Sequence, residues 1–277
     1  MKNRSLVTLV VALSVGVTLS ACQQDNKAVE KKLDDLSKQV TDLKKMVAAG
    51  GGGRGAAPAQ RPRRQEPDPK DVYAVPIDGL PFRGAADAPV TIVKAYEFAC
   101  PYCEKVRPTH DQILKDYDGK VKIVYDDFVV HPQYATMPAQ AACAATKQGK
   151  FPEMEHALWE KAFKTRKFDE DNMVALATEL GLNVDKFKTD MKGDCVAFVQ
   201  KNQATLRSFG VGATPAHFIN GRFLPGGAVP YPQFKAMIDE ELKKAEERIA
   251  AGTPKADYYK TWVMDKGLKK FTPKAEK

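Results

Sequence analysis

The chain has 277 residues, of which 43% are hydrophobic and 28% charged, with 43 Lys and Arg residues against 35 Asp and Glu residues. This composition supports at least one sizeable hydrophobic core, and it excludes an intrinsically disordered protein or a small disulfide-stapled one. The formal net charge is +8, but acidic side chains slightly outnumber basic ones within residues 71–252, so we expect no nucleic-acid-binding face there.

The chain begins with the pattern of a bacterial export signal. Two basic residues precede an apolar run over residues 6–19, which is too short to cross a bilayer comfortably and fits the core of a signal peptide. The run ends in Leu-Ser-Ala-Cys, which resembles the sequence at which bacterial lipoproteins are cleaved and lipidated. We predict a signal peptide over residues 1–21 and a lipid on Cys22, with an ordinary secretory signal and a free cysteine as the alternative.

Gln23 follows the predicted lipid-anchored cysteine and favours the outer membrane, with the body of the protein facing the periplasm. Residues 22–49 then predict a short coiled coil, and hence a possible homo-oligomer, with a lone amphipathic helix as the alternative. The apolar residues alternate in spacings of four and three at Val29, Leu33, Leu36, Val40, Leu43 and Val47. Residues 50–71 are rich in Gly, Pro and Arg and predict a linker that holds the following body away from the bilayer.

Residues 72–252 have the pattern of an α/β domain. β-branched and aromatic residues over 90–98 predict a buried strand, and a second strand is predicted over 121–128. Apolar residues at helical spacing over 104–117 predict a helix between them. The first part of the domain is therefore predicted to be a βαβ unit.

The second part of the domain is predicted to contain a helical insert over about residues 134–208. Its helices are expected at 137–148, 151–164, 169–180 and 194–209. A hairpin over 211–224 and a helix over 231–251 complete the domain. Residues 253–277 are predicted as a basic C-terminal tail.

Four cysteines remain beyond Cys22, an even number in a compartment that permits disulfides. Two of them form the motif Cys100-Pro101-Tyr102-Cys103, which follows the first predicted strand and starts the helix. In a βαβ unit such a motif is typical of a thioredoxin-like redox centre. The alternatives are a purely structural disulfide or half of a zinc site. No second such motif exists and the four histidines are scattered, so no metal site is predicted.

The order of these features resembles the DsbA-like branch of the thioredoxin superfamily over about residues 75–250. The resemblance rests on the cysteine motif, on Thr214-Pro215 after the helical block, and on the hairpin residues 218–221. It implies a thioredoxin fold with a helical insertion and the activity of an envelope thiol–disulfide oxidoreductase. It also implies a redox-active disulfide in place of a cofactor, reduced secreted or envelope proteins as substrates, and a quinone-linked membrane partner.

The position of the motif predicts its chemistry. Cys100 is placed at a helix N-terminus, where unpaired N–H groups and the helix dipole favour a thiolate, and Cys103 is expected to be the less exposed resolving thiol. Pro101 fits the first turn of a helix and removes one potential donor to the thiolate. Glu97 is the acid nearest the motif on its strand and is a candidate for the proton step. No role is assigned to Lys94, although family members often carry a buried acid at that place.

Further roles are implied by the resemblance. Pro215 would be a cis-proline facing the motif and Thr214 would contact substrate, with an ordinary trans loop proline as the alternative. Cys143 and Cys195, both in the helical block, would form a structural disulfide. A second redox pair or two free buried thiols are the alternatives.

The direction of the reaction is left open by these residues. We favour a dithiol oxidase for secreted proteins. The Cys-Pro-Tyr-Cys motif and the Thr before the predicted cis-proline also resemble DsbG-type enzymes, and a coiled coil would supply an oligomer, so a disulfide isomerase or reductase is the alternative. A redox-silent envelope tether is a third hypothesis, which the intact Cys100 and Cys103 disfavour.

Overall fold

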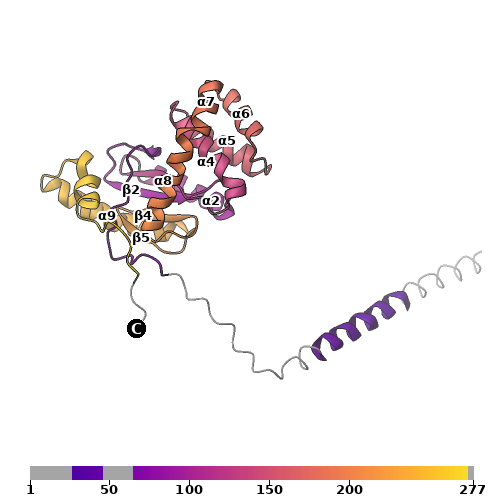
Figure 1. Ribbon diagram of the computed structural model, residues 1–277. Helices are drawn as coiled ribbons and strands as arrows, with labels where there is room; N and C mark the ends of the chain where they lie inside the picture. The colour runs from indigo at the N-terminus through magenta and orange to yellow at the C-terminus, as the bar shows by residue number, and fades with distance from the viewer. Residues whose placement is uncertain (1–26, 46–64, 274–277) are drawn as a thin grey trace, which may run out of the picture. The chain divides into compact units, whose positions relative to one another are not determined.

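The computed structural model describes residues 27–45 and 65–273, and the chain divides into two compact units, 1–63 and 64–277. In the first unit, residues 27–45 form a helix (Figure 1). The described apolar side chains of the heptad pattern are 47% to 60% exposed, at Val29, Leu33, Leu36, Val40 and Leu43. The predicted signal peptide and the predicted lipidation site, Cys22, lie outside the described residues.

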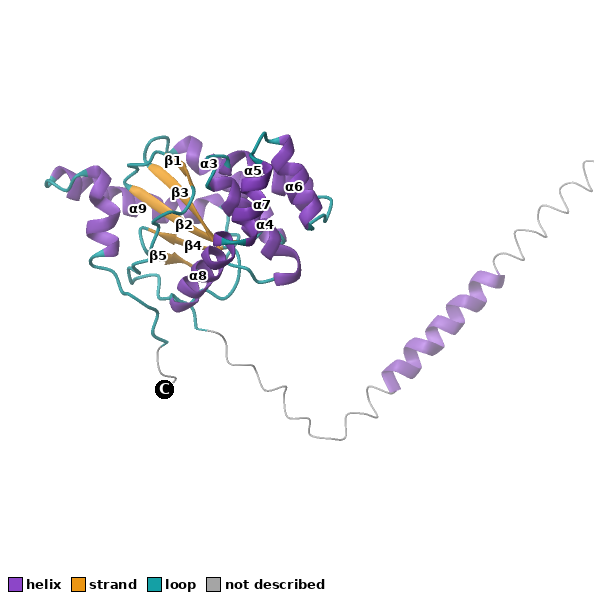
Figure 2. Cartoon of the chain, turned by 45° about the horizontal axis from the view of Figure 1, so that its top comes forward, coloured by secondary structure: helices purple, strands orange, loops and turns teal. Residues whose placement is uncertain are grey.

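The second unit is built on a five-stranded sheet with the strand order β1-β3-β2-β4-β5 (Figure 2). The central strands, β2 (Val90–Tyr96) and β3 (Val121–Asp127), are parallel, and all other neighbouring strands are antiparallel. The helices α2 (Pro101–Lys105) and α3 (Arg107–Asp116) connect β2 to β3, because parallel strands need a crossover. The remaining strands are β1 (Phe82–Gly84), β4 (Ala216–Ile219) and β5 (Arg222–Leu224).

The two faces of the sheet pack into two hydrophobic cores. Ile92 and Tyr96 of β2 point to the core that contains α2, α3, most of the helical insertion and α9 (Tyr231–Ala250). Val93 and Ala95 point to the opposite core, since successive side chains of a strand alternate between faces. Because both faces are covered, β2 is buried along its whole length, which is why its sequence is a continuous apolar run interrupted only by Thr91 and Lys94.

A helical insertion lies between β3 and β4, and its helices α4 to α7 gather beside the sheet (Figure 1). It consists of α4 (Pro132–Thr146), α5 (Phe151–Ala157), the π-helix η2 (Leu158–Phe163), α6 (Glu170–Glu179), α7 (Val184–Lys192) and α8 (Asp194–Ser208). Buried alanines of α4 let α7 and α8 pack closely against it. Helix α7 was not predicted; the Asn183 side chain caps it by accepting a hydrogen bond from the Lys186 N–H at 2.9 Å.

The segment predicted as a basic tail is packed on the domain as far as it is described. It contains the 3₁₀-helix η3 (Lys255–Asp257) and the π-helix η4 (Lys260–Met264). Tyr259 is buried, and its hydroxyl donates a hydrogen bond to the Val75 carbonyl at 2.8 Å. The basic charge of this segment predicts a solvated tail, but its aromatic residues bury apolar area and attach it to the domain.

No helix within residues 27–45 and 65–273 combines the length and the apolar character that are needed to cross a membrane.

Candidate active site

The two thiols of the predicted redox motif lie where β2 leads into α2. Cys100 is the N-cap residue of α2, with extended backbone angles (φ −86°, ψ 118°), and Pro101 occupies the first turn. The Cys103 N–H donates to the Cys100 carbonyl at 3.1 Å. Both cysteines are free thiols, and Cys100 is 4% exposed whereas Cys103 is fully buried. Tyr102 between them is exposed.

The surroundings shift the pKa values of the two thiols in opposite directions. The pKa of Cys100 is lowered from 9.0 to about 6, mainly because the Cys103 thiol hydrogen-bonds to the Cys100 thiolate. The Thr214 side chain and the backbone at Tyr102 and Cys103 also favour the thiolate, and burial opposes them. Burial raises the pKa of Cys103 well above its ordinary value. At neutral pH the reduced pair is therefore a thiolate at Cys100 beside a protonated thiol at Cys103.

A distant loop completes this face of the molecule. The Thr214–Pro215 peptide bond is cis, and the Cys100 thiol donates to the Thr214 carbonyl across 3.4 Å. A carbonyl oxygen cannot donate a proton, so this contact belongs to the protonated thiol and does not lower the pKa of Cys100. A groove of about 430 Å³ opens beside it, lined by Tyr102, Thr214, Pro215 and Glu66, among others. The structure thus brings the predicted substrate-contact residues next to the motif.

Glu97, the candidate for the proton step, is fully buried, but its carboxylate is directed to another loop. It accepts hydrogen bonds from the N–H groups of Val130 at 2.6 Å and His131 at 2.9 Å, and it pairs with the His131 imidazole. The backbone of Glu97, by contrast, hydrogen-bonds to the Cys103 thiolate and favours that form. The side chain therefore positions the start of the helical insertion.

The side chain of Lys94 is fully buried. It interacts electrostatically with Cys103. Its Nζ lies 5.0 Å from the ring centroid of Tyr96 and 5.1 Å from that of Tyr125. Among the described residues it has no hydrogen-bond acceptor. Burial lowers the pKa of Lys94, because a low-dielectric interior disfavours the charged amine. The Lys94 amine therefore lies in the interior of the domain, away from solvent.

A buried histidine pair next to Lys94 was missed by the sequence analysis. His110 of α3 and His217 of β4 lie with their Nε2 atoms 3.1 Å apart, and β4 places His217 opposite Lys94 in the sheet. Burial lowers the pKa of His217 to about 3 and that of His110 well below its ordinary value. Residues 27–45 and 65–273 contain no group of three or more His, Cys, Asp or Glu placed to hold a metal ion.

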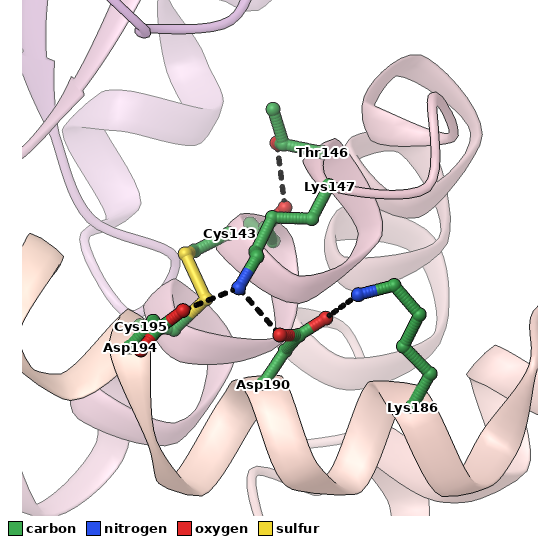
Figure 3. Close-up of a disulfide and its surroundings, with 8 residues drawn as sticks. Cys143, Thr146, Lys147, Lys186, Asp190, Asp194 and Cys195 are labelled. Atoms are coloured by element: carbon green, nitrogen blue, oxygen red, sulfur yellow. Dashed lines mark hydrogen bonds and ion pairs between the residues drawn. A yellow bond between two sulfur atoms is a disulfide. The ribbon is translucent and has the colours of Figure 1, made fainter.

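The other two cysteines are joined to each other. Cys143 of α4 and Cys195 at the start of α8 form a disulfide across 52 residues of sequence, with Cα atoms 5.7 Å apart. Figure 3 shows Lys147 beside this disulfide, paired with Asp190 and, at 2.8 Å, with Asp194. The bond therefore ties together two helices of the insertion and takes no part in the Cys100 site.

Comparison with known proteins places the chain among the thioredoxins. A sequence model of the thioredoxin family matches residues 78–240, more than half of the chain. The chain belongs to the thioredoxin family. The crystal structure of oxidised BdbD from Bacillus subtilis superposes with a TM-score of 0.58 at 23% identity, covering 65% of this chain and all of that one. The predicted thioredoxin fold with a helical insertion is confirmed.

Sequence relatives of this thioredoxin-family chain differ in how much of each is matched. The "Disulfide bond formation protein D" of Bacillus subtilis is 26% identical over 178 residues, which are 60% of this chain and 79% of that protein. The "Na(+)/H(+) antiporter NhaA 3" of Salinispora tropica is 37% identical over 146 residues, or 50% of this chain. The match spans only 21% of the antiporter, so the similarity is confined to a small part of that protein.

Proposed function

We propose that the protein is a thiol–disulfide oxidoreductase that oxidises dithiols of secreted or envelope proteins through a Cys100–Cys103 disulfide, without a bound cofactor. The observation that carries the proposal is the placement of the two thiols: Cys100 caps the N-terminus of α2 and contacts the loop with the cis Thr214–Pro215 peptide, whereas Cys103 is fully buried. This placement lowers the pKa of Cys100 to about 6 and raises that of Cys103. A stable thiolate is a good leaving group and stabilises the reduced form, so the disulfide of this pair oxidises other dithiols.

The burial of Cys103 and the helix-cap position of Cys100 support the following order of bond changes. A substrate thiolate attacks Sγ of Cys100, the sulfur at the surface end of the pair, and the electron pair of the broken S–S bond passes to Cys103. Cys103 then takes up a proton, because burial disfavours its thiolate. The second substrate thiolate then attacks the substrate sulfur that is bonded to Cys100. The Cys100 sulfur is the leaving group and departs as a thiolate. The substrate gains a disulfide, and the protein keeps two electrons and one proton.

Turnover requires an acceptor for those two electrons. We propose a quinone-linked membrane partner, which the resemblance to DsbA-like enzymes implies. The proposed location is the bacterial envelope, with the body facing the periplasm and a lipid on Cys22 as the anchor, favouring the outer membrane. Replacing Cys22 by serine should release the protein into the soluble fraction or leave it unprocessed. Membrane partitioning of a processed Cys22→Ser protein would contradict the anchor.

The redox state of the pair in intact cells tests the direction of the reaction. Trapping thiols by alkylation should find Cys100 and Cys103 mainly oxidised at steady state, because an oxidase waits for substrate in its disulfide form. The Cys143–Cys195 disulfide is the internal control and should be oxidised throughout. A pair found mainly reduced would contradict the oxidase and favour an isomerase or reductase.

The isomerase alternative has one observation in its favour, the row of exposed apolar side chains on the helix over residues 27–45. Such a row fits a coiled coil and hence a homo-oligomer. Leu36→Asp should then lower the mass measured by light scattering, whereas Thr41→Asp, outside the apolar row, should not. A monomeric mass for the wild-type protein would remove the oligomer and most of the isomerase case.

A further inference from the structure

The groove beside the reactive thiols is partly bounded by a segment that precedes the predicted domain. Tyr102 and the Thr214–Pro215 peptide line the side next to the motif, and Glu66 lines the groove as well. A substrate must bring a sulfur atom to Cys100, which neighbours the lining residues Tyr102 and Thr214, so the residues flanking the substrate cysteine can reach this groove. Glu66 therefore lies where it can meet a substrate side chain.

Glu66 differs in charge from the rest of the groove. Among the described residues that line it, the others are Gly, Ala, Val, Phe, Tyr, Thr and Pro, and Glu66 alone is charged. The Glu66 side chain is exposed, so its carboxylate is accessible from solvent. A mainly apolar groove with one carboxylate is complementary to an extended peptide that carries apolar side chains and one cation.

The backbone next to Glu66 is attached to the domain. Pro67 is buried against Gly210, so closely that a Cβ on Gly210 would lie 3.2 Å from Pro67 Cγ. Arg222 of β5 donates from Nε to the Pro69 carbonyl at 3.0 Å. These contacts fix the backbone next to Glu66, so that its exposed side chain starts from a defined place beside the groove.

We infer that Glu66 selects substrate peptides with a Lys or Arg close to the reacting cysteine. The inference rests on the proposed function and adds a substrate class to it. The carboxylate attracts a cationic side chain and repels an acidic one. Because the pair is exposed to water, we expect a preference of roughly two- to fivefold in kcat/KM for a basic over an acidic peptide. The preference should shrink at high ionic strength, since salt screens exposed charges.

The test uses the full-length oxidised protein and reduced test peptides with two cysteines. The peptides differ in a single residue, Lys or Glu, placed in turn at each position flanking the first cysteine. The wild-type protein should prefer Lys at one or more positions. Glu66→Gln should bring the ratio of the two kcat/KM values close to one, and Glu66→Lys should invert it. Asp118→Asn, an exposed acid outside the groove, should keep the wild-type ratio.

Oxidation of dithiothreitol by the wild-type protein separates the two ways of failing. If neither dithiothreitol nor any peptide is oxidised, the proposed function fails. If dithiothreitol and peptides are oxidised but the Lys-to-Glu ratio is the same in the wild type, Glu66→Gln and Glu66→Lys, the inference about Glu66 is overturned and the proposed function stands. Equal changes in Asp118→Asn and Glu66→Gln would also overturn it, since the net charge alone would then explain the preference.

Discussion

The two cysteine pairs of this chain have opposite surroundings. Cys100 and Cys103 lie at a helix N-terminus, and Cys103 interacts electrostatically with the buried amine of Lys94, which has no hydrogen-bond acceptor among the described residues. Cys143 and Cys195 join helices of the insertion next to buried alanines and the ion pairs of Lys147. The first pair closes a very short loop and constrains the unfolded chain little, whereas the second closes a long one. We conclude that the surroundings and the loop length determine whether a pair is suited to reactivity or to stability.

The largest expected effect is on activity. Cys100→Ser should reduce oxidation of a dithiol peptide to the uncatalysed rate, because no sulfur remains for the substrate to attack. The double variant Cys143→Ala/Cys195→Ala should keep most of the activity at 25 °C. A stopped-time thiol assay measures both. Residual turnover by Cys100→Ser, or loss of turnover in a folded double alanine variant, would contradict the division of roles.

Stability should depend on the Cys143–Cys195 pair, whereas activity depends on Cys100. Removing the Cys143–Cys195 disulfide, which spans 52 residues, should lower the free energy of unfolding. The chain-entropy estimate for such a loop is about 4 kcal/mol. Urea unfolding of Cys143→Ala/Cys195→Ala and of the wild-type protein, both without reductant, measures the change. A loss below about 1 kcal/mol would mean that the insertion does not depend on this bond.

The third effect is on titration. Thiolate absorbance of the reduced protein should rise with a pKa of about 6, and this step should disappear in Cys100→Ser. It should persist in Cys103→Ala with a higher pKa, since alanine cannot donate the hydrogen bond that Cys103 gives to the Cys100 thiolate. Because folding lowers the pKa of Cys100, the thiolate stabilises the reduced protein above the unfolded thiol pKa. This stabilisation is lost as the pH falls through about 6. A single step near 8.5 would contradict the predicted thiolate.

The smallest effect concerns the buried amine near Cys103. Lys94→Met should raise the free energy of unfolding by about 1–3 kcal/mol near neutral pH, because an amine buried without an acceptor is costly. Folding lowers the pKa of Lys94, so the cost is largest at low pH, and the gain from Met should disappear as the pH rises past about 10.4. Exposed Lys188→Met is the control. A destabilised Lys94→Met protein would show that the amine has a partner that offsets its burial.

Much of the fold followed from local patterns. The apolar run of β2 and the helical spacing of α5, α6, α8 and α9 each reflect burial that is visible along the chain. The near-complete burial of β3, by contrast, includes its two aspartates. The pattern did not reveal β1, which has three residues, or α7, whose charged side chains hide a narrow buried face. The segment with η3 and η4 was overlooked because its net charge concealed buried Tyr258 and Tyr259.

The order strand, Cys-Pro-Tyr-Cys, helix follows from the sequence alone, and with it the N-terminal position of Cys100, since these relations are local. Which distant groups meet Cys100 depends on the packing of the whole domain. Thr214 reaches Cys100 across 114 residues, and His217 meets His110 across 107. The carboxylate of Glu97 is engaged by His131 instead of the thiols. Such contacts depend on how the sheet and helices pack, and no spacing along the chain encodes them.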